Sequence, residues 1–580
     1  MNLLKHYFLV WAELGAMLLA FASVWLAPGL LDFVLRPLWK IAVRNASNRK
    51  AAWAVAFSLP LALRLLVWPM TKIPVPNVQD EFSFLLMADT FASGRITNPT
   101  HPMWVHFETM HVLQHPTYAS MYPVMQGLFL ALGQVIGHAP WLGVWLSVIL
   151  MCGSFYWALR AWMPPVWALG GAALAAIRIA MFSYWMSSYW GGAPAAIGGA
   201  LVLGALHRVF QFKRTTDSLW LAAGILILAN SRPYEGFFYC LPVAVLLFAW
   251  LFGADDFCRW FGLKPRGKTD LPRILMRVVA PMALVLVLGG VAMMYYFWRV
   301  TGNPVKMPYQ VWAEQYSVTP LFVWQKFRPL HRYNNEVLRY FFTQWNTVRA
   351  SEPRRLVWYW LFYVGPVLTL PLALAWTAWR DRKMRFFLAL FGFVLLAVSI
   401  EWWAYPHYAA PAVAALYALI LQNLRHLRAG LYRRGARSRW RGLVPLVPAV
   451  IVVMIAVRFA TPAFSLAIPG WLLTWAGGPQ KPGRSKVEAV LNNKEGKHLV
   501  LVRYVDHYDR ASINDEWVYN RDDIDASKIV WARELDPEQN RKLIKYFHDR
   551  DIWLYLWKEH TLIPLSTDGG IGTDIEANPP

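Results

Sequence analysis

Cysteine is nearly absent from this 580-residue sequence, which contains three cysteines and none in its last hundred residues. Cys152, Cys240 and Cys258 all lie in or beside apolar segments. The sequence therefore does not predict a disulfide framework of the kind that holds small secreted domains together. Acidic residues are also scarce, because 34 Asp and Glu stand against 57 Lys and Arg and leave a net charge of +23.

The excess of positive charge lies in short connectors between apolar runs. Clear examples are 36–50, 254–273 and 425–441, the last of which carries seven arginines. Lys and Arg are enriched in the cytoplasmic loops of membrane proteins. We therefore attribute the charge to membrane topology, and we do not expect a nucleic-acid partner.

Long apolar segments are abundant in this sequence. The chain is 57% hydrophobic, contains 33 Trp and has a mean hydropathy of +0.32. Segments of about 17–25 apolar residues match the bilayer hydrocarbon, where only helices satisfy their own backbone hydrogen bonds in a chain of this kind. The sequence predicts an all-α polytopic membrane bundle over 1–475 with about twelve transmembrane helices. The expected spans are near 7–31, 51–69, 141–161, 165–183, 193–210, 218–232, 234–253, 274–299, 356–378, 386–401, 405–424 and 443–461.

The basic connectors set the expected orientation of the bundle. If 36–50 and 207–217 both face the cytoplasm, the segment 70–118 after the span 51–69 lies outside, and an odd number of crossings must separate 70–118 from 207–217. The weakly apolar segment 119–138 then lies along the outer interface and does not cross the membrane. The same assignment makes 70–138 a first outer loop with interfacial helices and 300–355 a second outer loop.

The C-terminal part of the chain is polar and mixed in charge. The expected elements are strands at 498–505, 528–535 and 551–557 and a helix at 536–549, with Asp536 as N-cap and Pro537 in the first turn. Strands that alternate with a helix predict a small α/β domain over 486–580, on the extracytoplasmic side.

Two adjacent carboxylates, Asp80 and Glu81, follow the second apolar run in the stretch VPNVQDEFSF. In a partly dehydrated groove, desolvation and mutual repulsion raise the pKa of such a pair. One carboxylate could then accept a proton from an attacking hydroxyl or amine. The alternative is that Asp80 caps a helix that begins beside it.

The first outer loop also contains four histidines, His101, His106, His111 and His115. Their spacing matches no compact metal motif, although Asp, Glu and His side chains could converge on a divalent cation. We favour polar groove lining over metal binding. Aromatic residues that could stack on sugar faces, or belong to an interfacial belt, are Trp104, Tyr118, Tyr122, Trp402 and Trp403.

Further ionisable groups lie at the expected outer ends of other spans. These are Arg232 and Glu235 in NSRPYEG, and Glu401, His407 and Tyr408 in IEWWAYPHYAAP. The second outer loop is basic, with Arg328 and Arg332 among its cations, which runs against the positive-inside trend. Such cations could hold a phosphate or could contact anionic lipid headgroups.

Taken together, the chain resembles the GT-C superfamily of polytopic glycosyltransferases, in particular its protein O-mannosyltransferase and aminoarabinose-transferase-like branch. The resemblance depends on the Asp80-Glu81 pair at the start of a large outer loop, the motif HPTYASMYP, about twelve spans, the motif YPHYAAP and a soluble C-terminal domain. The chain differs from the usual pattern because it has no clear Pro-Pro pair after the loop histidine.

The resemblance implies transfer of a sugar from a polyprenyl-phosphate carrier to an acceptor outside the cytoplasm. It implies that Asp80 is the base and that Glu81 orients a substrate. It further implies that Arg328, Arg332, His407 and Tyr408 are candidates to hold the lipid phosphate. No cofactor is required by this interpretation, and a divalent cation remains open.

A transporter or flippase of lipid-linked sugars or other anions is the competing hypothesis. It predicts ionisable groups near the bilayer midplane, whereas here they gather at the outer edge. We therefore favour a transferase in a bacterial inner membrane, with a polyprenyl-phosphate-linked sugar as donor, an unknown acceptor and membrane lipids as partners.

Overall fold

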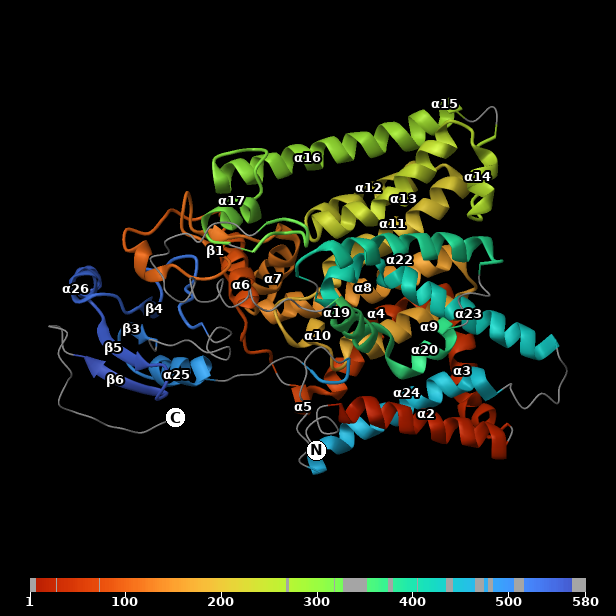
Figure 1. The fold of residues 1–580 in the computed structure, drawn as a ribbon, viewed down its shortest axis with the longest axis horizontal. Helices are drawn as coiled ribbons and strands as arrows, with labels where there is room; N and C mark the ends of the chain where they lie inside the picture. The colour runs from red at the N-terminus through yellow and green to blue at the C-terminus, as the bar shows by residue number, and fades with distance from the viewer. Residues whose placement is uncertain are drawn as a thin grey trace.

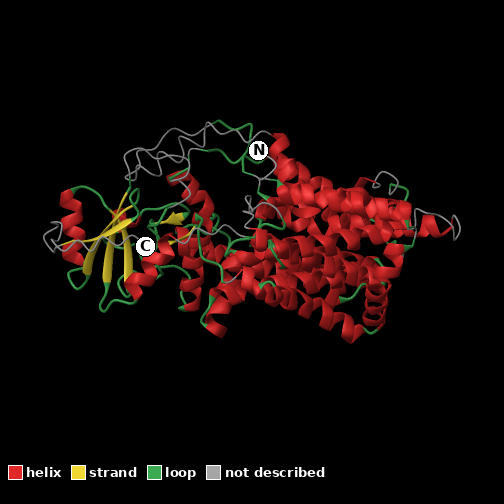
Figure 2. Cartoon of the chain, turned by 90° about the horizontal axis from the view of Figure 1, so that it is seen from below, coloured by secondary structure: helices red, strands yellow, loops and turns green. Residues whose placement is uncertain are grey.

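The structure is a computed structural model, and it describes residues 7–27, 29–71, 73–267, 271–317, 319–326, 352–373, 379–403, 405–433, 442–464, 474–477, 483–504 and 516–565. A bundle of long helices makes up most of the molecule, and a small domain with a β-sheet lies beyond one end of it (Figure 1). Figure 2, turned by 90°, again shows the sheet at this end only. The expected fold class, a helical membrane bundle with a small α/β domain, is therefore confirmed.

Each of the twelve expected spans contains helix. The helices of the bundle are α2 (Phe8–Leu26), α4 (Arg49–Leu66), α8 (Pro140–Trp162), α9 (Pro165–Ala175), α11 (Ala193–Phe212), α12 (Thr215–Ala229), α13 (Pro233–Leu251), α16 (Ala280–Thr301), α19 (Glu352–Tyr359), α20 (Gly365–Ala373), α22 (Arg382–Ile400), α23 (Val413–Arg433) and α24 (Leu443–Ala460). Short π-helical turns follow α9 and α19 and precede α16. In the described residues, eight helices are long and apolar enough to cross a membrane. The number of crossings, about twelve, stays a prediction.

The two ends of the bundle differ in charge. The connector helices α3 (Leu30–Ser47), α14 (Asp255–Trp260) and α15 (Leu271–Ile274) lie at the end away from the sheet (Figure 1). They contain or adjoin the basic connectors 36–50 and 254–273. The first outer loop and the C-terminal domain lie at the opposite end, as the positive-inside rule requires if the basic end is cytoplasmic.

The first outer loop contains two helices that pack against each other, α6 (Gln79–Ala92) and α7 (Val124–Gly137). Between them lie a 3-10 turn (Trp104–Phe107) and a short hairpin of β1 (Val112–Leu113) and β2 (Ala119–Ser120). Helix α7 has 14 residues, so at 1.5 Å per residue it is about 21 Å long, which is less than the thickness of the hydrocarbon core. That 119–138 lies along the interface stays a prediction.

A glycine contact fixes α7 against the bundle. A Cβ atom at Gly143, on α8, would lie 1.9 Å from the backbone oxygen of Phe129 on α7. Because Gly143 carries no side chain, the two helices approach each other at backbone distance, as small residues allow in membrane proteins. This contact holds α7 against α8, so the side chains of α7 have defined positions.

Further short helices and turns lie at the same end of the bundle as the first outer loop. Helix α5 (Trp68–Thr71) precedes the first outer loop, α10 (Tyr184–Ser187) lies between α9 and α11, and α17 (Pro308–Gln315) follows α16. A 3-10 turn (Pro406–Ala412) leads into α23, and another (Thr461–Phe464) follows α24. Residues 327–351 of the second outer loop, including Arg328 and Arg332, lie outside the described residues.

The C-terminal domain has a four-stranded sheet in the order β4-β3-β5-β6. Strands β3 (His498–Arg503), β4 (Ile529–Arg533) and β5 (Asp551–Leu556) are parallel, and β6 (Thr561–Leu565) pairs antiparallel with β5. Helices α25 (Gly483–Asn492) and α26 (Pro537–Tyr546) pack against the sheet. The expected N-cap is present, because Asp536 Oδ1 accepts from two backbone amides at 3.0 Å.

One hydrophobic core joins this domain to the membrane bundle. Leu499, Leu501 and Leu554 of the sheet are buried in the same cluster as Phe82 and Leu86 of α6. The first outer loop therefore covers one side of the C-terminal domain as well as the end of the bundle.

Candidate functional site

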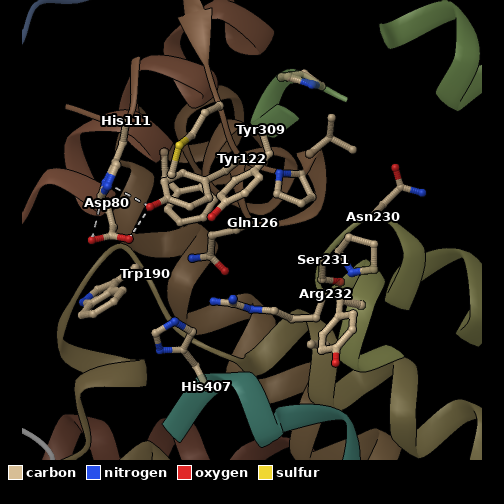
Figure 3. A pocket seen from close by; sticks show the side chains of 18 of the residues that line it. Asp80, His111, Tyr122, Gln126, Trp190, Asn230, Ser231, Arg232, Tyr309 and His407 are labelled. Atoms are coloured by element: carbon tan, nitrogen blue, oxygen red, sulfur yellow. Dashed lines mark hydrogen bonds and ion pairs between the residues drawn. The ribbon is translucent and has the colours of Figure 1, made fainter. Parts of the chain in front are cut away.

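A cavity of about 530 Å³ lies beside the first turn of α6. Its walls come from the first outer loop, the segment before α11, the corner between α12 and α13, the ends of α16 and α17, and the turn before α23 (Figure 3). Its lining includes Asp80, His111, Tyr122, Gln126, Trp190, Arg232, Glu235, Tyr309, Trp312, Glu401, Trp403, His407 and Tyr408. Residues from distant parts of the sequence are thus combined at the end of the bundle that carries the C-terminal domain.

Asp80 contacts two side chains at one end of the cavity. The hydroxyl of Tyr122 donates a hydrogen bond to Asp80 Oδ1, and the same hydroxyl lies 3.1 Å from His111 Nδ1. His111 Nδ1 also lies 3.9 Å from Asp80 Oδ2 (Figure 3). Asp80 Oδ1 therefore takes the hydrogen bond, and the contact of Oδ2 with His111 is longer than a hydrogen bond.

The protonation of this group follows from its geometry. Burial raises the pKa of Tyr122 well above its usual value, and the nearby Asp80 acts in the same direction. Burial lowers the pKa of His111, although Asp80 opposes this. Tyr122 therefore stays protonated and donates to Asp80. A neutral His111 with its proton on Nδ1 can then donate to the oxygen of Tyr122.

The backbone around His111 supports this arrangement. His111 has a left-handed φ of 63°, which is uncommon for a residue other than glycine. Its carbonyl oxygen accepts hydrogen bonds from Ser83 Oγ at 2.6 Å and from the Met121 amide at 3.2 Å. Phe84 stacks on Tyr122 with ring centroids 4.5 Å apart. These contacts tie the hairpin to α6 and point His111 and Tyr122 toward Asp80.

Glu81 has a different environment from its neighbour. It is completely buried and is not part of the cavity wall. Its Oε2 accepts from the amides of Asn77 at 2.8 Å and Val78 at 3.2 Å, and its Oε1 accepts from the amide of Tyr189 at 2.9 Å. Burial raises the pKa of Glu81 to about 7, although these hydrogen bonds oppose the change. The start of α6 is therefore capped by Glu81 and not, as the alternative above has it, by Asp80.

Arg232 lies at the other end of the cavity, at the corner where α13 begins (Figure 3). Its Nη1 is 3.8 Å from Glu235 Oε1, and its guanidinium lies 4.2 Å from the centre of the Tyr408 ring. Among the described residues that line the cavity, Arg232 is the single Arg or Lys. His407 is held nearby, with Nδ1 2.8 Å from the hydroxyl of Tyr184.

Several predicted site residues contact the C-terminal domain and do not line the cavity. His101 Nε2 lies 3.1 Å from Asp525 Oδ1, His106 Nδ1 lies 2.9 Å from the carbonyl oxygen of Arg533, and Tyr118 donates to the carbonyl oxygen of Asn520 at 3.0 Å. His115 packs its ring edge-on against Trp104, also away from the cavity. The contacts of His101, His106 and Tyr118 link the first outer loop to the C-terminal domain. His115 packs within the loop itself.

Four other lining residues were not singled out in the sequence: Gln126, Trp190, Tyr309 and Trp312. Trp312 of α17 lies 5.2 Å from the His111 ring. Aromatic residues are so common in this chain that none of them stands out in the sequence. Gln126 is one of two glutamines in the apolar helix α7, and a polar side chain in such a helix is the signal that could have found it.

The structure allows a limited test of the metal hypothesis. In the described part of the chain, no three His, Cys, Asp or Glu side chains converge in a way that could hold a metal ion. His101, His106, His111 and His115 are separated between the domain contact and the cavity. The regular spacing of these histidines in the sequence thus places them on different surfaces of one loop.

Comparisons with known proteins give structural likeness at low sequence identity. No protein-family model matches the sequence, and no curated protein sequence matches it. The chain is similar to ArnT from Cupriavidus metallidurans in the apo state, with 15% identity, a TM-score of 0.48 and coverage of 87% of this chain and 93% of that one. It is also similar to the same protein bound to undecaprenyl phosphate, with 14% identity, a TM-score of 0.46 and coverage of 86% and 92%.

A second likeness is to the oligosaccharyltransferase of Archaeoglobus fulgidus, solved with Zn and sulfate. Here the identity is 12%, the TM-score is 0.46, and the match covers 78% of this chain. The chain spans about 60% of the length of that protein.

Proposed function

We propose that this protein is an integral membrane glycosyltransferase that moves a sugar from a polyprenyl-phosphate carrier to an acceptor on the non-cytoplasmic side. The observation that carries the proposal is that a carboxylate, Asp80, and a guanidinium, Arg232, line one cavity at the end of the bundle opposite the basic connectors. The carrier lipid is what the GT-C resemblance of the sequence implies.

Asp80 is the general base in this proposal. As the acceptor oxygen or nitrogen bonds to the anomeric carbon, its proton passes to Asp80 Oδ2, the oxygen that the Tyr122 hydroxyl does not use. Tyr122 and His111 keep the carboxylate oriented. A correctly positioned base contributes about 10²–10⁴-fold to the rate of such a step.

Arg232 meets the leaving group. When the bond between the anomeric carbon and the phosphate oxygen breaks, the electron pair stays with the carrier phosphate. A guanidinium is well suited to that charge because it binds phosphate through two N–H groups. Arg232 also stands at the N-terminus of α13, where the helix dipole favours an anion. His407 and Tyr408 adjoin Arg232 and remain candidates at this end.

Two residues change their roles relative to the sequence hypothesis. Glu81 caps α6 from behind the cavity, so we assign it no contact with substrate. Arg232 takes the role of phosphate ligand that the sequence hypothesis gave to Arg328 and Arg332. Trp190, Tyr309 and Trp403 supply aromatic faces in the cavity on which a sugar can stack.

The test is sugar transfer by the purified protein in liposomes that contain radiolabelled undecaprenyl-phosphate sugars and an extract of membrane acceptors. Asp80→Asn should reduce transfer at least a hundredfold while the melting temperature stays unchanged. The matched control is Asp89→Asn, on the same helix but outside the cavity, where Asp89 pairs with Arg521. Arg232→Ala should weaken binding of undecaprenyl phosphate, and Arg232→Lys should restore part of it.

Transfer that survives Asp80→Asn at the native rate would overturn the assignment of the base. If no transfer is found with any donor, and the protein moves labelled lipid between the two leaflets, the transporter hypothesis replaces this one. The control with Asp89→Asn separates both outcomes from a general effect of losing a carboxylate from α6.

A further inference from the structure

His407 lines the cavity beside the proposed phosphate ligand. The residue is only 2% exposed and lies in the turn before α23. Its ring is directed into the cavity between Trp190 and Arg232 (Figure 3). One ring nitrogen, Nδ1, lies 2.8 Å from the hydroxyl of Tyr184. In the part of the chain that the structure describes, the other ring nitrogen, Nε2, has no hydrogen-bond partner. Nε2 is therefore the ring atom open to a ligand in the cavity.

Tyr184 holds His407 from behind. It belongs to the short helix α10, is completely buried and does not line the cavity. Its hydroxyl oxygen accepts a hydrogen bond from the backbone amide of His407 at 3.1 Å and also contacts Nδ1 of the same residue. The hydroxyl of Tyr363 donates to the carbonyl oxygen of Pro406 at 2.5 Å and holds the preceding peptide. Both the backbone and the ring of His407 are thus fixed.

The contacts of Tyr184 favour one tautomer of His407. Burial raises the pKa of Tyr184, so its hydroxyl keeps its proton. A hydroxyl has one proton to donate, and this oxygen already accepts from the amide of His407. When the hydroxyl proton is donated to Nδ1, the neutral imidazole carries its own proton on Nε2. Nε2 is then a hydrogen-bond donor to the cavity.

A neutral donor at this place suits an anion that is held by Arg232. The ring of Tyr408 lies 5.0 Å from the ring of His407 and 4.2 Å from the guanidinium of Arg232, so the two groups flank one side chain. Glu235 lies 3.8 Å from Arg232 and shares its charge, so a phosphate here gains from a second donor. An ionised phosphate offers several acceptor oxygens. A neutral imidazole adds an N–H group without adding a second positive charge beside Arg232.

We propose that His407 donates a hydrogen bond from Nε2 to the carrier phosphate, and that Tyr184 is the positioning residue that fixes this tautomer. This inference rests on the proposed function and adds to it a second phosphate donor and the residue that orients it. When the bond between the anomeric carbon and the phosphate oxygen breaks, the electron pair stays with the phosphate and the Nε2 proton stays on His407. Tyr184 touches no substrate, so its effect passes through His407.

The test is binding of undecaprenyl phosphate to the detergent-solubilised full-length protein, with undecaprenol as the uncharged probe. His407→Leu should weaken binding of undecaprenyl phosphate about tenfold to a hundredfold, the range for a hydrogen bond to a charged group, and leave undecaprenol within about twofold. His407→Gln places an amide N–H near the position of Nε2, so its affinity for undecaprenyl phosphate should stay within about threefold of the native value. His407→Asn places its amide near Nδ1 and should resemble His407→Leu.

Tyr184→Phe tests the positioning role because it removes only the hydroxyl. It should weaken binding of undecaprenyl phosphate about threefold to tenfold. In ¹⁵N NMR spectra of histidine-labelled protein, the His407 signals, assigned by their absence in His407→Gln, should show the proton on Nε2 in the native protein and a mixture of tautomers in Tyr184→Phe. The matched control is Tyr239→Phe. Tyr239 is also completely buried, donates to the carbonyl oxygen of Gly199 at 3.0 Å and does not line the cavity, so this variant should bind as the native protein does.

Equal weakening of undecaprenyl phosphate and undecaprenol by His407→Leu would overturn the phosphate contact, and so would native affinity in His407→Asn. A native spectrum with the proton on Nδ1, or an unchanged spectrum in Tyr184→Phe, would overturn the positioning role. Failure of the proposed function gives a different result. In that case transfer is absent or survives Asp80→Asn, while the loss of phosphate binding in His407→Leu and Tyr184→Phe still supports the inference.

Discussion

Asp80 and Glu81 are neighbours in the first turn of α6, yet the fold uses them in opposite ways. The side chain of Asp80 is 22% exposed in the cavity, and its partners are the side chains of Tyr122 and His111. Glu81 is completely buried, and its partners are backbone amides. One carboxylate therefore lines the cavity, and the other holds the start of α6 through its hydrogen bonds.

Residues of the first outer loop differ in the same way, because some line the cavity and others pack on the C-terminal domain. Its cavity face carries His111 and Tyr122. Its other face packs on the C-terminal domain, where Phe82 stacks on Tyr519 with centroids 4.5 Å apart and Ser93 donates to Asp522 at 2.8 Å. The comparison teaches that residue type alone does not distinguish a side chain that lines the cavity from one that supports the fold. What separates them is whether the polar atoms of a side chain are already used by the protein.

The largest expected effect on stability is a pH dependence from Glu81. Its pKa in the folded protein is about 7, against 4.5 for an unperturbed side chain, and burial is the main cause. Because the folded state holds this proton more tightly, the stabilising contribution is fully present below pH 4.5 and is lost as the pH rises through 7. The loss is on the order of 3 kcal/mol.

The measurement is the melting temperature of the solubilised protein from pH 5 to pH 8.5. Glu81→Gln does not titrate in this range, so the difference between native and variant isolates the contribution of this carboxyl. Identical pH dependence in the two proteins would contradict the assignment.

A smaller effect is expected from Glu81→Gln at fixed pH. Glutamine offers one oxygen where Glu81 offers two, so its NH₂ group must face either the amide of Tyr189 or the amides of Asn77 and Val78. A donor that faces a donor leaves a buried N–H without an acceptor, at a cost of about 2 kcal/mol. We expect a lower melting temperature at pH 6 with sugar transfer per folded molecule within a few fold.

Asp80→Asn is the natural control, because it should change transfer and leave the melting temperature alone. If the two substitutions give the same pair of effects, the division between cavity and support is wrong.

Much of the fold could be predicted from the sequence, because its cause is local. Apolar runs indicated where the long helices lie, and Asp536 followed by Pro537 indicated the start of α26. The edge strand β6 was missed because Pro564 interrupts a short run, although proline is tolerated at a sheet edge. For the candidate site, the Asp80-Glu81 pair pointed to the turn of helix that borders the cavity.

The part of the site that could not be predicted depends on side-chain direction in a long loop. His101, His106, His111 and His115 recur at nearly even spacing, but their direction depends on a hairpin with a left-handed residue at His111 and on the docked C-terminal domain. The periodicity of the sequence does not predict the directions of these side chains, because the loop is neither a regular helix nor a long strand. Tertiary contacts determine the directions of these side chains.

The smallest expected effect compares two tyrosines of the motif HPTYASMYP. Tyr118, a candidate for sugar stacking in the sequence, donates instead to the carbonyl oxygen of Asn520 and is 4% exposed. Tyr118→Phe removes that hydrogen bond, so we expect a loss of about 1 kcal/mol in stability and no change in KM for the donor. Tyr122→Phe makes the same chemical change four residues later, where the hydroxyl holds Asp80. It should reduce kcat about tenfold with little change in melting temperature, since only the orientation of the base is lost. The measurements are the melting temperature and the steady-state kcat and KM for sugar transfer of both variants. A changed KM for the donor in Tyr118→Phe would indicate that Tyr118 contacts the substrate.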